Sequence, residues 1–288
     1  MRLWLERLLQ DVRYAIRGLA RNPGFALVIV VSLGLGIGAN SALFSVMDAV
    51  LLRPLPVAHP EQLFALDLTE SRFRSPQPFS YPMFEQMRAV APSGIAAMSR
   101  IARTHGRIDA TSGGTSELET IPVQLVSGEY FRMLGIVPAL GRVFGPGDNE
   151  RVGQHPVAVI SHDFWQRRFG SARDVLGRGV TLNGAHFTIV GVASPGFRGL
   201  WLESPTDIWI PLMMQSAVHY AQNFSDNNAD PEKPWLNQEG IRWLDIVVRS
   251  RHDATAIDTV FRQWLAASAE KISKPDNRRL FLQQRVIL

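Results

Sequence analysis

Three consecutive residues, Ser161, His162 and Asp163, are of the types that act as nucleophile, general base and orienting acid in hydrolases. Such a relay requires each group to hydrogen-bond to the next. Side chains of consecutive residues point apart on a strand or a helix, so these three cannot form the relay together. We expect them to end a strand and to cap the helix that follows. A hydrolase assembled from distant residues stays a minor alternative, and we predict no catalytic residue and no enzyme.

The histidines offer no spacing that is typical of a metal site. None stands four residues from another beside a glutamate, as in a zinc-protease motif. His155 and His162 flank a predicted strand, and a metal role is the less favoured interpretation of that pair. The sequence has no cysteine, which excludes disulfides and thiolate ligands. We therefore predict no metal site and no bound cofactor.

Nucleotide-binding loops are also missing from the sequence. The three lysines are Lys233, Lys271 and Lys274, and none follows a glycine or precedes Ser or Thr, so a phosphate-binding P-loop is absent. Glycines at positions 34, 36 and 38 lie inside an apolar run and do not follow a strand, which excludes a dinucleotide fingerprint. If ATP drives this protein, we expect another polypeptide to bind it.

The chain is basic, with a net charge of +4 and a pI near 9.8. The positive charge is concentrated near the N-terminus, in arginines at positions 2, 7, 13, 17 and 21. A nucleic-acid-binding protein carries its basic charge on the folded domain. Here the charge precedes an apolar segment, so we expect membrane lipid as a partner and no nucleic acid.

The apolar segment runs from Phe25 to Met47 without a charged side chain. At ~1.5 Å per residue a helix of this length is roughly 34 Å long, enough to cross a ~30 Å hydrocarbon core. The preceding arginines favour a cytoplasmic N-terminus in the cell (inner) membrane. We predict that residues after about position 52 are periplasmic or otherwise extracytoplasmic.

A cleaved signal peptide is the rival interpretation of the same segment. Ala39 and Ser41 stand two residues apart, as small residues do at a cleavage site. Against cleavage, Glu6 and Asp11 interrupt the basic region, and the apolar run continues past Ala42 to Met47. We favour an uncleaved membrane anchor.

These features divide the chain into three predicted parts. Residues 3–20 place leucines, Val12 and Ile16 on one helical face and charged residues on the other, which is typical of a helix lying in the lipid interface. A docking helix for a partner protein is the alternative. We predict a cytoplasmic amphipathic interfacial helix over 1–22, a transmembrane helix over 23–52 and an extracytoplasmic domain over 53–288.

Within the predicted span, Gly34, Gly38 and Ala42 recur every four residues. Small residues at this spacing let a second helix approach closely in lipid. Asn40 is a polar residue at membrane depth, and such residues face protein or water rather than lipid. We predict a helix-packing face at these four positions, with another copy, another protein or a missing permease half as partner. Ordinary abundance of glycine in membrane helices is the alternative.

The ectodomain mixes strands and helices in an irregular order. Asn183-Gly184 between two apolar runs is a strong hairpin signal. Residues 219–240 are polar and predict a long exposed loop or a subdomain junction. Trp201, Trp209 and Trp243 predict core or junction packing. The mixture favours an α+β class over a doubly wound sheet. We predict strands at 63–68, 95–101, 118–126, 157–160, 180–182, 186–192, 243–248 and 280–286, and helices at 81–88, 129–134, 163–169 and 254–271.

Short motifs follow one another in a fixed order along the chain. Up to the end of the apolar run they are DVRYA at 11–15, NPGF at 22–25, GIGANSALFSV at 36–46 and LLRPLP at 51–56. In the ectodomain they include SYP at 80–82, SGEYF at 127–131, GRVF at 141–144, LNG at 182–184, VGV at 190–192, PGFRG at 195–199 and DIWIPL at 207–212. The ordered set resembles the MacB-like ABC transporter permeases. Among these it most resembles the bacterial branch of duplicated orphan permeases.

The resemblance implies a permease whose periplasmic core domain combines a porter-like subdomain with a second mixed subdomain. It also implies a separate cytoplasmic ATPase subunit that moves the spans. The ectodomain would couple this movement to work outside the cytoplasm. Such permeases have later spans, whereas this chain stops at Leu288, so we expect a truncated subunit or a piece of a longer reading frame. The alternative is a stand-alone membrane-anchored periplasmic binding or interaction module.

The motifs that carry the resemblance mark a set of residues as structural rather than catalytic. These residues are Arg53, Pro54, Tyr130, Phe131, Gly135, Gly141, Arg142, Asn183, Gly184, Gly191, Trp209 and Pro211.

Overall fold

A computed structural model of the chain describes residue 18 and residues 21–47, 56–69, 75–108, 118–201, 204–225, 229–270 and 284–287. The chain divides into two compact units, Met1–Pro54 and Leu55–Leu288. The predicted helix over residues 3–20 and the predicted boundary near residue 52 lie outside the described residues.

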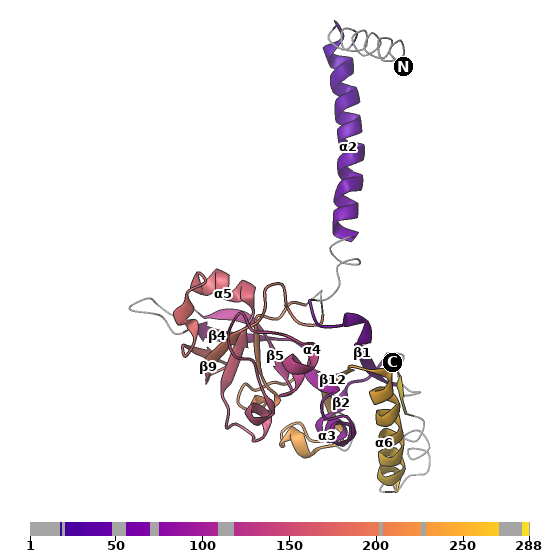
Figure 1. Cartoon of the computed structure of the whole chain (residues 1–288), viewed down its shortest axis with the longest axis vertical. Coiled ribbons are helices and arrows are strands. Elements are labelled where there is room, and N and C mark those ends of the chain that lie inside the picture. The colour runs from indigo at the N-terminus through magenta and orange to yellow at the C-terminus, as the bar shows by residue number, and fades with distance from the viewer. Residues whose placement is uncertain are drawn as a thin grey trace. The chain divides into compact units, whose positions relative to one another are not determined.

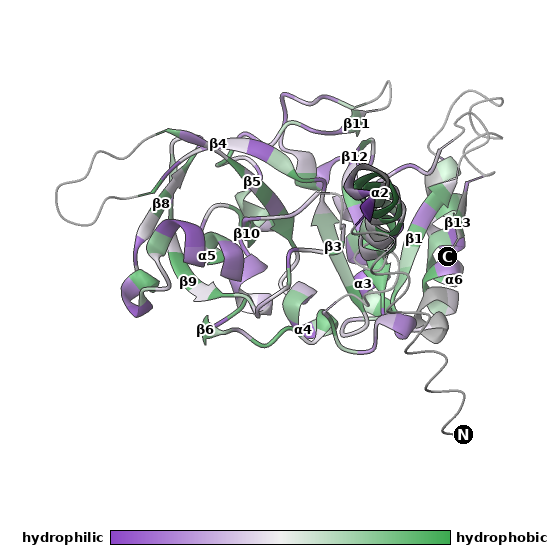
Figure 2. Cartoon of the chain, turned by 90° about the horizontal axis from the view of Figure 1, so that it is seen from above, coloured by the Kyte–Doolittle hydropathy of each residue, from purple (hydrophilic) through white to green (hydrophobic). Residues whose placement is uncertain are grey.

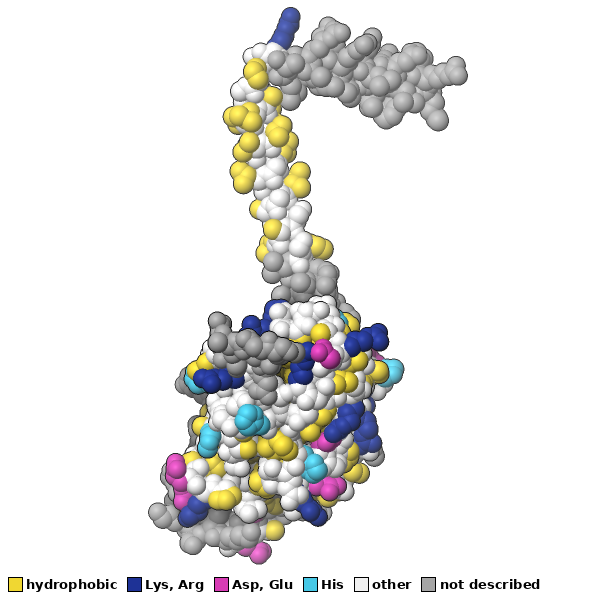
Figure 3. Space-filling view, turned by 90° about the vertical axis from the view of Figure 1, so that its left-hand side faces the viewer, with side chains coloured by type: hydrophobic (Ala, Val, Ile, Leu, Met, Phe, Trp, Pro, Cys, Tyr) yellow, Lys and Arg dark blue, Asp and Glu magenta, His cyan; other side chains and the backbone are white. Residues whose placement is uncertain are grey.

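The first unit contains one long helix, α2, which spans Pro23–Met47 (Figure 1). Within it Ala26–Ser45 is long and apolar enough to cross a membrane. No other helix among the described residues is both long and apolar enough. Most of its described leucine, valine and isoleucine side chains are exposed, and in Figure 3 the helix shows hydrophobic and uncharged side chains. The predicted apolar helix is therefore confirmed as a helix, with Pro23 in its first turn, where a missing backbone N–H costs least.

In the second unit, six strands form a closed ring in the order β5-β10-β7-β9-β8-β4, with β4 pairing back to β5. The β5–β10 and β7–β9 pairs are parallel and the others antiparallel. The strand bounds are β4 Ala102–Ile108, β5 Glu119–Val126, β7 Val157–Ile160, β8 Gly179–Leu182, β9 Ala185–Val192 and β10 Ile208–Pro211. A short strand, β6 (Leu140–Gly141), adds to β9. The β8–β9 hairpin turns at Asn183 and Gly184, both with positive φ, as a two-residue hairpin turn requires.

The same β5 continues into a second group of strands, because its last residue, Val126, pairs with Met98 of β3. From there the order is β3-β12-β1-β13, all antiparallel, with β2 and β11 pairing to β12. The bounds are β1 Phe64–Thr69, β2 Phe79–Ser80, β3 Ile95–Ser99, β11 Phe224–Ser225, β12 Ile241–Val248 and β13 Arg285–Ile287. The ectodomain is thus one continuous sheet with two halves that share β5.

Two helices, α3 (Tyr81–Val90) and α6 (Arg251–Ala269), pack on each other and on β12 in the second half (Figures 1 and 2). Two shorter helices, α4 (Tyr130–Leu134) and α5 (His162–Phe169), follow β5 and β7. The hydroxyls of Ser80 and Ser161 accept from the backbone of α3 and α5 and cap them. Gly135 and Gly170 end α4 and α5 in the left-handed conformation. Short 3₁₀ turns lie at Pro60–Gln62, Pro146–Asn149, Arg173–Val175, Leu212–Met214 and Trp235–Asn237.

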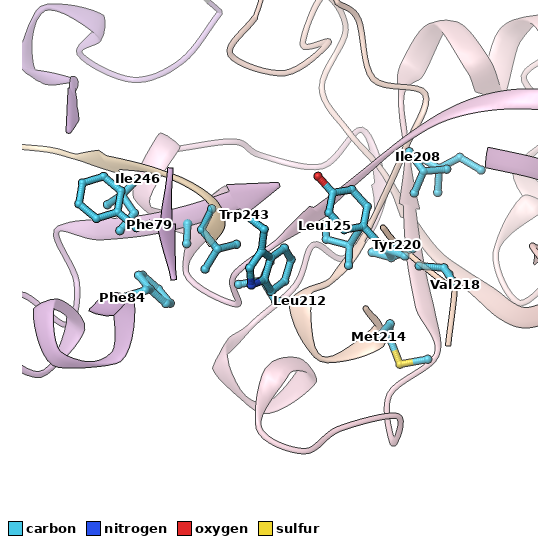
Figure 4. Packing of buried hydrophobic residues seen from close by; sticks show 14 of the residues in the cluster. Phe79, Phe84, Leu125, Ile208, Leu212, Met214, Val218, Tyr220, Trp243 and Ile246 are labelled. Carbon is cyan, nitrogen blue, oxygen red and sulfur yellow. The ribbon is translucent and has the colours of Figure 1, made fainter. Parts of the chain in front are cut away.

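Both faces of the sheet are buried where the two halves meet. Along β10, Ile208 and Ile210 belong to one hydrophobic cluster and Trp209 to another on the opposite face. Successive side chains of a strand point to opposite faces, so an uninterrupted apolar strand must be covered on both. The larger cluster runs from the ring to the α3 side, as Figure 4 shows for Ile208, Tyr220, Trp243 and Phe84 among others.

The structure confirms the predicted α+β class and nearly all predicted elements. Five strands were not predicted: β4, β10 and the two-residue strands β2, β6 and β11. The final strand is seen only at Arg285–Ile287, because residues 271–283 are not described. Residues 219–240 are largely irregular, as predicted, apart from β11 and the turn Trp235–Asn237. The predicted burial of Trp209 and Trp243 is confirmed, whereas that of Trp201 is wrong, since 39% of Trp201 is exposed.

Candidate functional site

The first stretch of ectodomain after the apolar helix is fastened to α4. We call residues 56–59 the post-span segment. Its Ala58 N–H donates to the carbonyl of Leu134, the last residue of α4, at 2.9 Å. The Ala58 carbonyl accepts from Arg249 Nη1 at 2.8 Å. Both backbone groups of Ala58 are therefore engaged by the folded domain.

Arg249, directly after β12, connects the post-span segment to the end of α4 and to the residue before β3. Its Nε donates to the Met133 carbonyl at 2.7 Å, and its Nη2 donates to the same oxygen. Its own N–H donates to the Gly94 carbonyl at 2.8 Å, just before β3. The last carbonyls of a helix have no partner within the helix, and a cation there satisfies and stabilises them. One guanidinium thus holds Ala58, the end of α4 and the end of β12 together.

Gly135 makes the close approach of Ala58 to α4 feasible. Its φ of 71° lies in the left-handed region, which terminates α4. A Cβ at this position would lie 2.4 Å from the Cβ of Ala58. Any larger residue would both strain the backbone and push the post-span segment away.

On its other side, α4 carries aromatic residues into a buried group that we call the junction cluster: Tyr130, Phe131, Phe144, Phe197 and Trp209. Phe131 packs edge-on against Phe144 at 5.5 Å and against Trp209 at 5.7 Å between ring centroids. Phe197 stacks on Trp209 at 5.3 Å. The cluster also contains Met98 of β3 and Val126 of β5, so it bridges the ring and the second half of the sheet.

The junction cluster is uncharged at physiological pH. Burial raises the pKa of Tyr130, and the neighbouring Trp209 indole opposes this only in part. The phenol therefore stays protonated, and the cluster behaves as an apolar, close-packed contact.

The start of α4 is tied to α3 through a small ionic network. Glu129, which is 4% exposed, accepts from Arg88 Nη1 at 3.5 Å. Arg88 Nη2 also donates to Glu85 on its own helix, at 2.9 Å. Burial opposes the charge on Arg88, but Glu85 and Glu129 outweigh it and raise the pKa of Arg88. The helix α4 is thus fastened at both ends, to α3 at its start and to Ala58 at its end.

Gly141 of β6 pairs with Gly191 of β9, and Arg142 directly follows Gly141. Arg142 forms two hydrogen bonds with Asp148, at 2.6 and 2.8 Å, and Gly145 N–H donates to the same carboxylate. Burial would raise the pKa of Asp148, but these hydrogen bonds prevail and hold it below its ordinary value. Gly191 on β9 packs against Arg142, since a Cβ there would lie 1.9 Å from the Arg142 carbonyl oxygen.

The other residues that were predicted from the sequence motifs do not lie together in one site. Asn183 accepts from His105 N–H at 3.2 Å and donates to the Val218 carbonyl at 2.8 Å, which holds the hairpin turn with Gly184 to its neighbours. Pro211 ends β10. Gly34, Gly38, Asn40 and Ala42 lie exposed along α2. Arg53 and Pro54 lie outside the described residues.

The candidate chemistry of the sequence does not assemble into a site. Ser161 caps α5, accepting from Phe164 N–H at 3.1 Å, so its predicted role is confirmed. Asp163 pairs with Arg198 at 3.2 Å, and the His162 ring packs against Trp165. Among the described residues no group of three or more His, Asp or Glu could hold a metal ion.

Arg249 offers a direct test of the fastening. Replacing it by alanine removes hydrogen bonds from a charged donor, each worth about 1.5–3 kcal/mol. We expect the Ala58 amide of the full chain in detergent to exchange with deuterium at least about tenfold faster, since ~1.4 kcal/mol is a factor of ten.

Arg262→Ala is the matched control, because Arg262 forms a local ion pair with Asp258 on α6. It should leave exchange at Ala58 unchanged. Equal exchange at Ala58 in the wild type and in Arg249→Ala would show that Arg249 does not hold the post-span segment.

Comparison with known proteins gives one family. The model of the MacB-like periplasmic core domain matches residues 26–262. Among curated proteins, the chain is similar to a probable export ATP-binding/permease protein from Pseudomonas fluorescens (strain Pf0-1), 28% identical over 102 residues. The match covers 35% of this chain and 15% of that protein, so the chain spans a small part of that relative's length.

Several solved structures are similar to this chain, including the following two. One is the periplasmic region of MacB from Actinobacillus actinomycetemcomitans, with 13% identity, 72% of this chain and 87% of that chain covered, and a TM-score of 0.44. The other is the extracellular domain of the noncanonic ABC-type transporter YknZ from Gram-positive bacteria, with 14% identity, 78% and 100% covered, and a TM-score of 0.48.

Proposed function

The chain belongs to the MacB-like periplasmic core domain family, and on that premise we propose that it is a permease-type membrane subunit of a MacB-like ABC transporter assembly. The family and the apolar helix together support a membrane-anchored protein with an extracytoplasmic domain. In the proposal α2 crosses the membrane with the N-terminus in the cytoplasm, and the domain from about residue 53 lies outside.

The ectodomain's proposed role is to couple movement of the spans to work outside the membrane. The observation that carries it is the fastening of Ala58 to α4 and Arg249. A displacement of α2 would reach the domain first at the post-span segment. From there α4 would pass it to the junction cluster, where the two halves of the sheet meet. A close-packed apolar contact transmits displacement because it does not deform continuously.

We propose that a separate cytoplasmic ATPase subunit supplies the energy for such movement; the support is the printed name of the curated relative, which joins ATP binding with a permease. Contacts within the membrane would involve the face of α2 formed by Gly34, Gly38, Asn40 and Ala42. We propose another span, from a second copy or from the rest of a permease, as the partner of this face.

The absence of cysteine makes the proposed topology directly testable. Gly147 lies exposed in the turn Pro146–Asn149, so Gly147→Cys should react with a membrane-impermeant maleimide on cells whose inner membrane is intact. Gln10→Cys should react only after that membrane is opened. Labelling of position 10 in intact cells, or release of the protein by carbonate, contradicts the topology.

The proposed assembly is tested by purification in mild detergent. We expect the chain to co-purify with a subunit that hydrolyses ATP, and Gly34→Leu with Gly38→Leu to reduce that association. The matched control is Leu33→Ile with Leu35→Ile, which leaves the small-residue face intact. An isolated monomer without ATPase, from cells in which the topology is correct, contradicts the permease proposal.

A further inference from the structure

One pocket of the ectodomain is lined by no residue of the post-span segment or of the junction cluster. It has a volume of about 550 Å³, within the ~300–1,000 Å³ of small-molecule sites. Its walls come from β1, β11 and β12, from the β3–β4 connection and from residues 75–78, 201 and 204. Nothing in the proposed permease role uses it.

Two exposed aromatic side chains meet at this pocket. Among the exposed large apolar residues of the described ectodomain, Trp201 and Phe224 are the aromatic ones, at 39% and 43% exposure. Both line the pocket. The Arg100 guanidinium lies over the Phe224 ring at 4.9 Å, which holds both groups in place. The pocket therefore presents flat apolar surfaces to the solvent.

Polar groups that form strong hydrogen bonds lie between these surfaces. Leu66 of β1 pairs with Ile246 of β12, so the adjacent residues Asp67 and Asp245 stand side by side across the two strands. Within the described part of the chain neither carboxylate forms an ion pair. Burial raises the pKa of both; at Asp245 Arg100 opposes the increase and Asp67 adds to it. The other polar lining residues are Gln77, Gln222, Ser75 and Ser204, and Leu66, Pro76, Pro78 and Ile101 add apolar surface.

The aromatic rings, the two carboxylates and the guanidinium together favour one class of ligand over others. A purely apolar ligand would bury the carboxylates without hydrogen-bond partners, which is unfavourable. An anion would meet two carboxylates, and a simple amine would leave the Arg100 donors unused. A pyranose ring has an apolar C–H face that stacks on indole and phenyl rings. Its rim of hydroxyls both donates to carboxylates and accepts from guanidinium and amide N–H groups.

We propose that the pocket formed by Trp201, Phe224, Arg100, Asp67 and Asp245 binds a neutral saccharide of one or two pyranose rings. The proposal is independent of the permease role, and an extracytoplasmic domain is where such a sugar would be met.

Saturation-transfer NMR tests the proposal with N,N′-diacetylchitobiose and maltose. The full chain is kept in a detergent without a sugar headgroup, so that the micelle supplies no competitor. We expect transfer from protein to at least one of the sugars. Trp201→Ala should weaken the apparent affinity at least tenfold, and Trp201→Phe should restore part of it, because a phenyl ring still stacks. Gln222→Ala, at an exposed lining residue, should weaken it several-fold.

Val137→Ala is the control, since Val137 is exposed at 73% and does not line the pocket. It should bind the sugars like the wild type. Lack of transfer to both sugars, unchanged binding in Trp201→Ala and Gln222→Ala, or displacement of the sugar by putrescine at equal concentration would each overturn the saccharide assignment. None of these outcomes bears on ATPase association, so the two proposals fail separately.

Discussion

Replacing Trp209 by alanine is expected to lower the free energy of unfolding of the ectodomain by about 3–5 kcal/mol, the usual cost of emptying a buried aromatic site. Trp209 is fully buried on β10 and stacks on Phe197, with Phe131 edge-on beside it. The indole lies in the cluster that bridges the two halves of the sheet, so the cavity would open where both must pack. Denaturant unfolding of the full chain in detergent, followed by near-UV circular dichroism, measures the loss.

Trp201→Ala is the matched control, because it removes the same side chain from a position that is 39% exposed. We expect a change within about 0.5 kcal/mol, as for most surface substitutions. Similar losses for Trp201→Ala and Trp209→Ala would contradict the placement of Trp209 at the centre of the junction.

Gly191→Ala is expected to cost about 3 kcal/mol, at the upper end of overpacking effects. A Cβ at this position would lie 1.9 Å from the Arg142 carbonyl oxygen and 2.8 Å from its carbonyl carbon. Both are backbone atoms, so no side-chain rotation relieves the collision. β9 must therefore move away from β6 or from the Arg142–Asp148 pair. Loss of the β6–β9 pairing should also appear as faster amide exchange at Arg142, because its N–H donates to the Val190 carbonyl.

Gly147→Ala is the control for this substitution, since a Cβ at Gly147 meets nothing within 4 Å. It should change the free energy of unfolding by no more than about 0.5 kcal/mol. A stable Gly191→Ala variant with unchanged exchange at Arg142 would show that β6 and β9 are not so closely packed.

Local signals predicted most of the secondary structure. Ser80 and Ser161 mark helix starts because their hydroxyls satisfy backbone N–H groups within the next turn. Gly135 and Gly170 mark helix ends because only glycine adopts the left-handed conformation without strain. Asn183-Gly184 fixes a hairpin for the same reason. Each signal depends on residues within four positions, which a sequence displays directly.

Two of the missed strands, β4 and β10, lack the apolar alternation that marks a half-buried strand. The residues of β4 do alternate between exposed and buried positions, but the buried ones are Thr104 and Gly106, which give no apolar signal. β4 reads ARTHGRI, with basic residues at its exposed positions and Gly106 packed against Ile121. β10 is apolar at every position because both of its faces are buried. Its neighbours, β5 and β7, come from distant parts of the chain, and no local pattern reveals that closure.

The candidate site was predictable only in part. The apolar helix and the aromatic residues Tyr130, Phe131 and Trp209 stand out from the sequence or from its family resemblance. Ala58 and Arg249 do not, because the hydrogen bond between them joins residues 191 positions apart. Arginines are frequent in this chain, and only the fold selects the one at the end of β12.

The closed ring has a further consequence for the association of the domain with other molecules. A sheet that returns to its first strand leaves no row of unpaired backbone groups for a neighbouring molecule to join. Within the described residues, the path from the ring through β5 ends at β13. Self-association by strand addition would therefore begin at β13. A proline or lysine introduced into this edge strand should reduce such association and so preserve solubility.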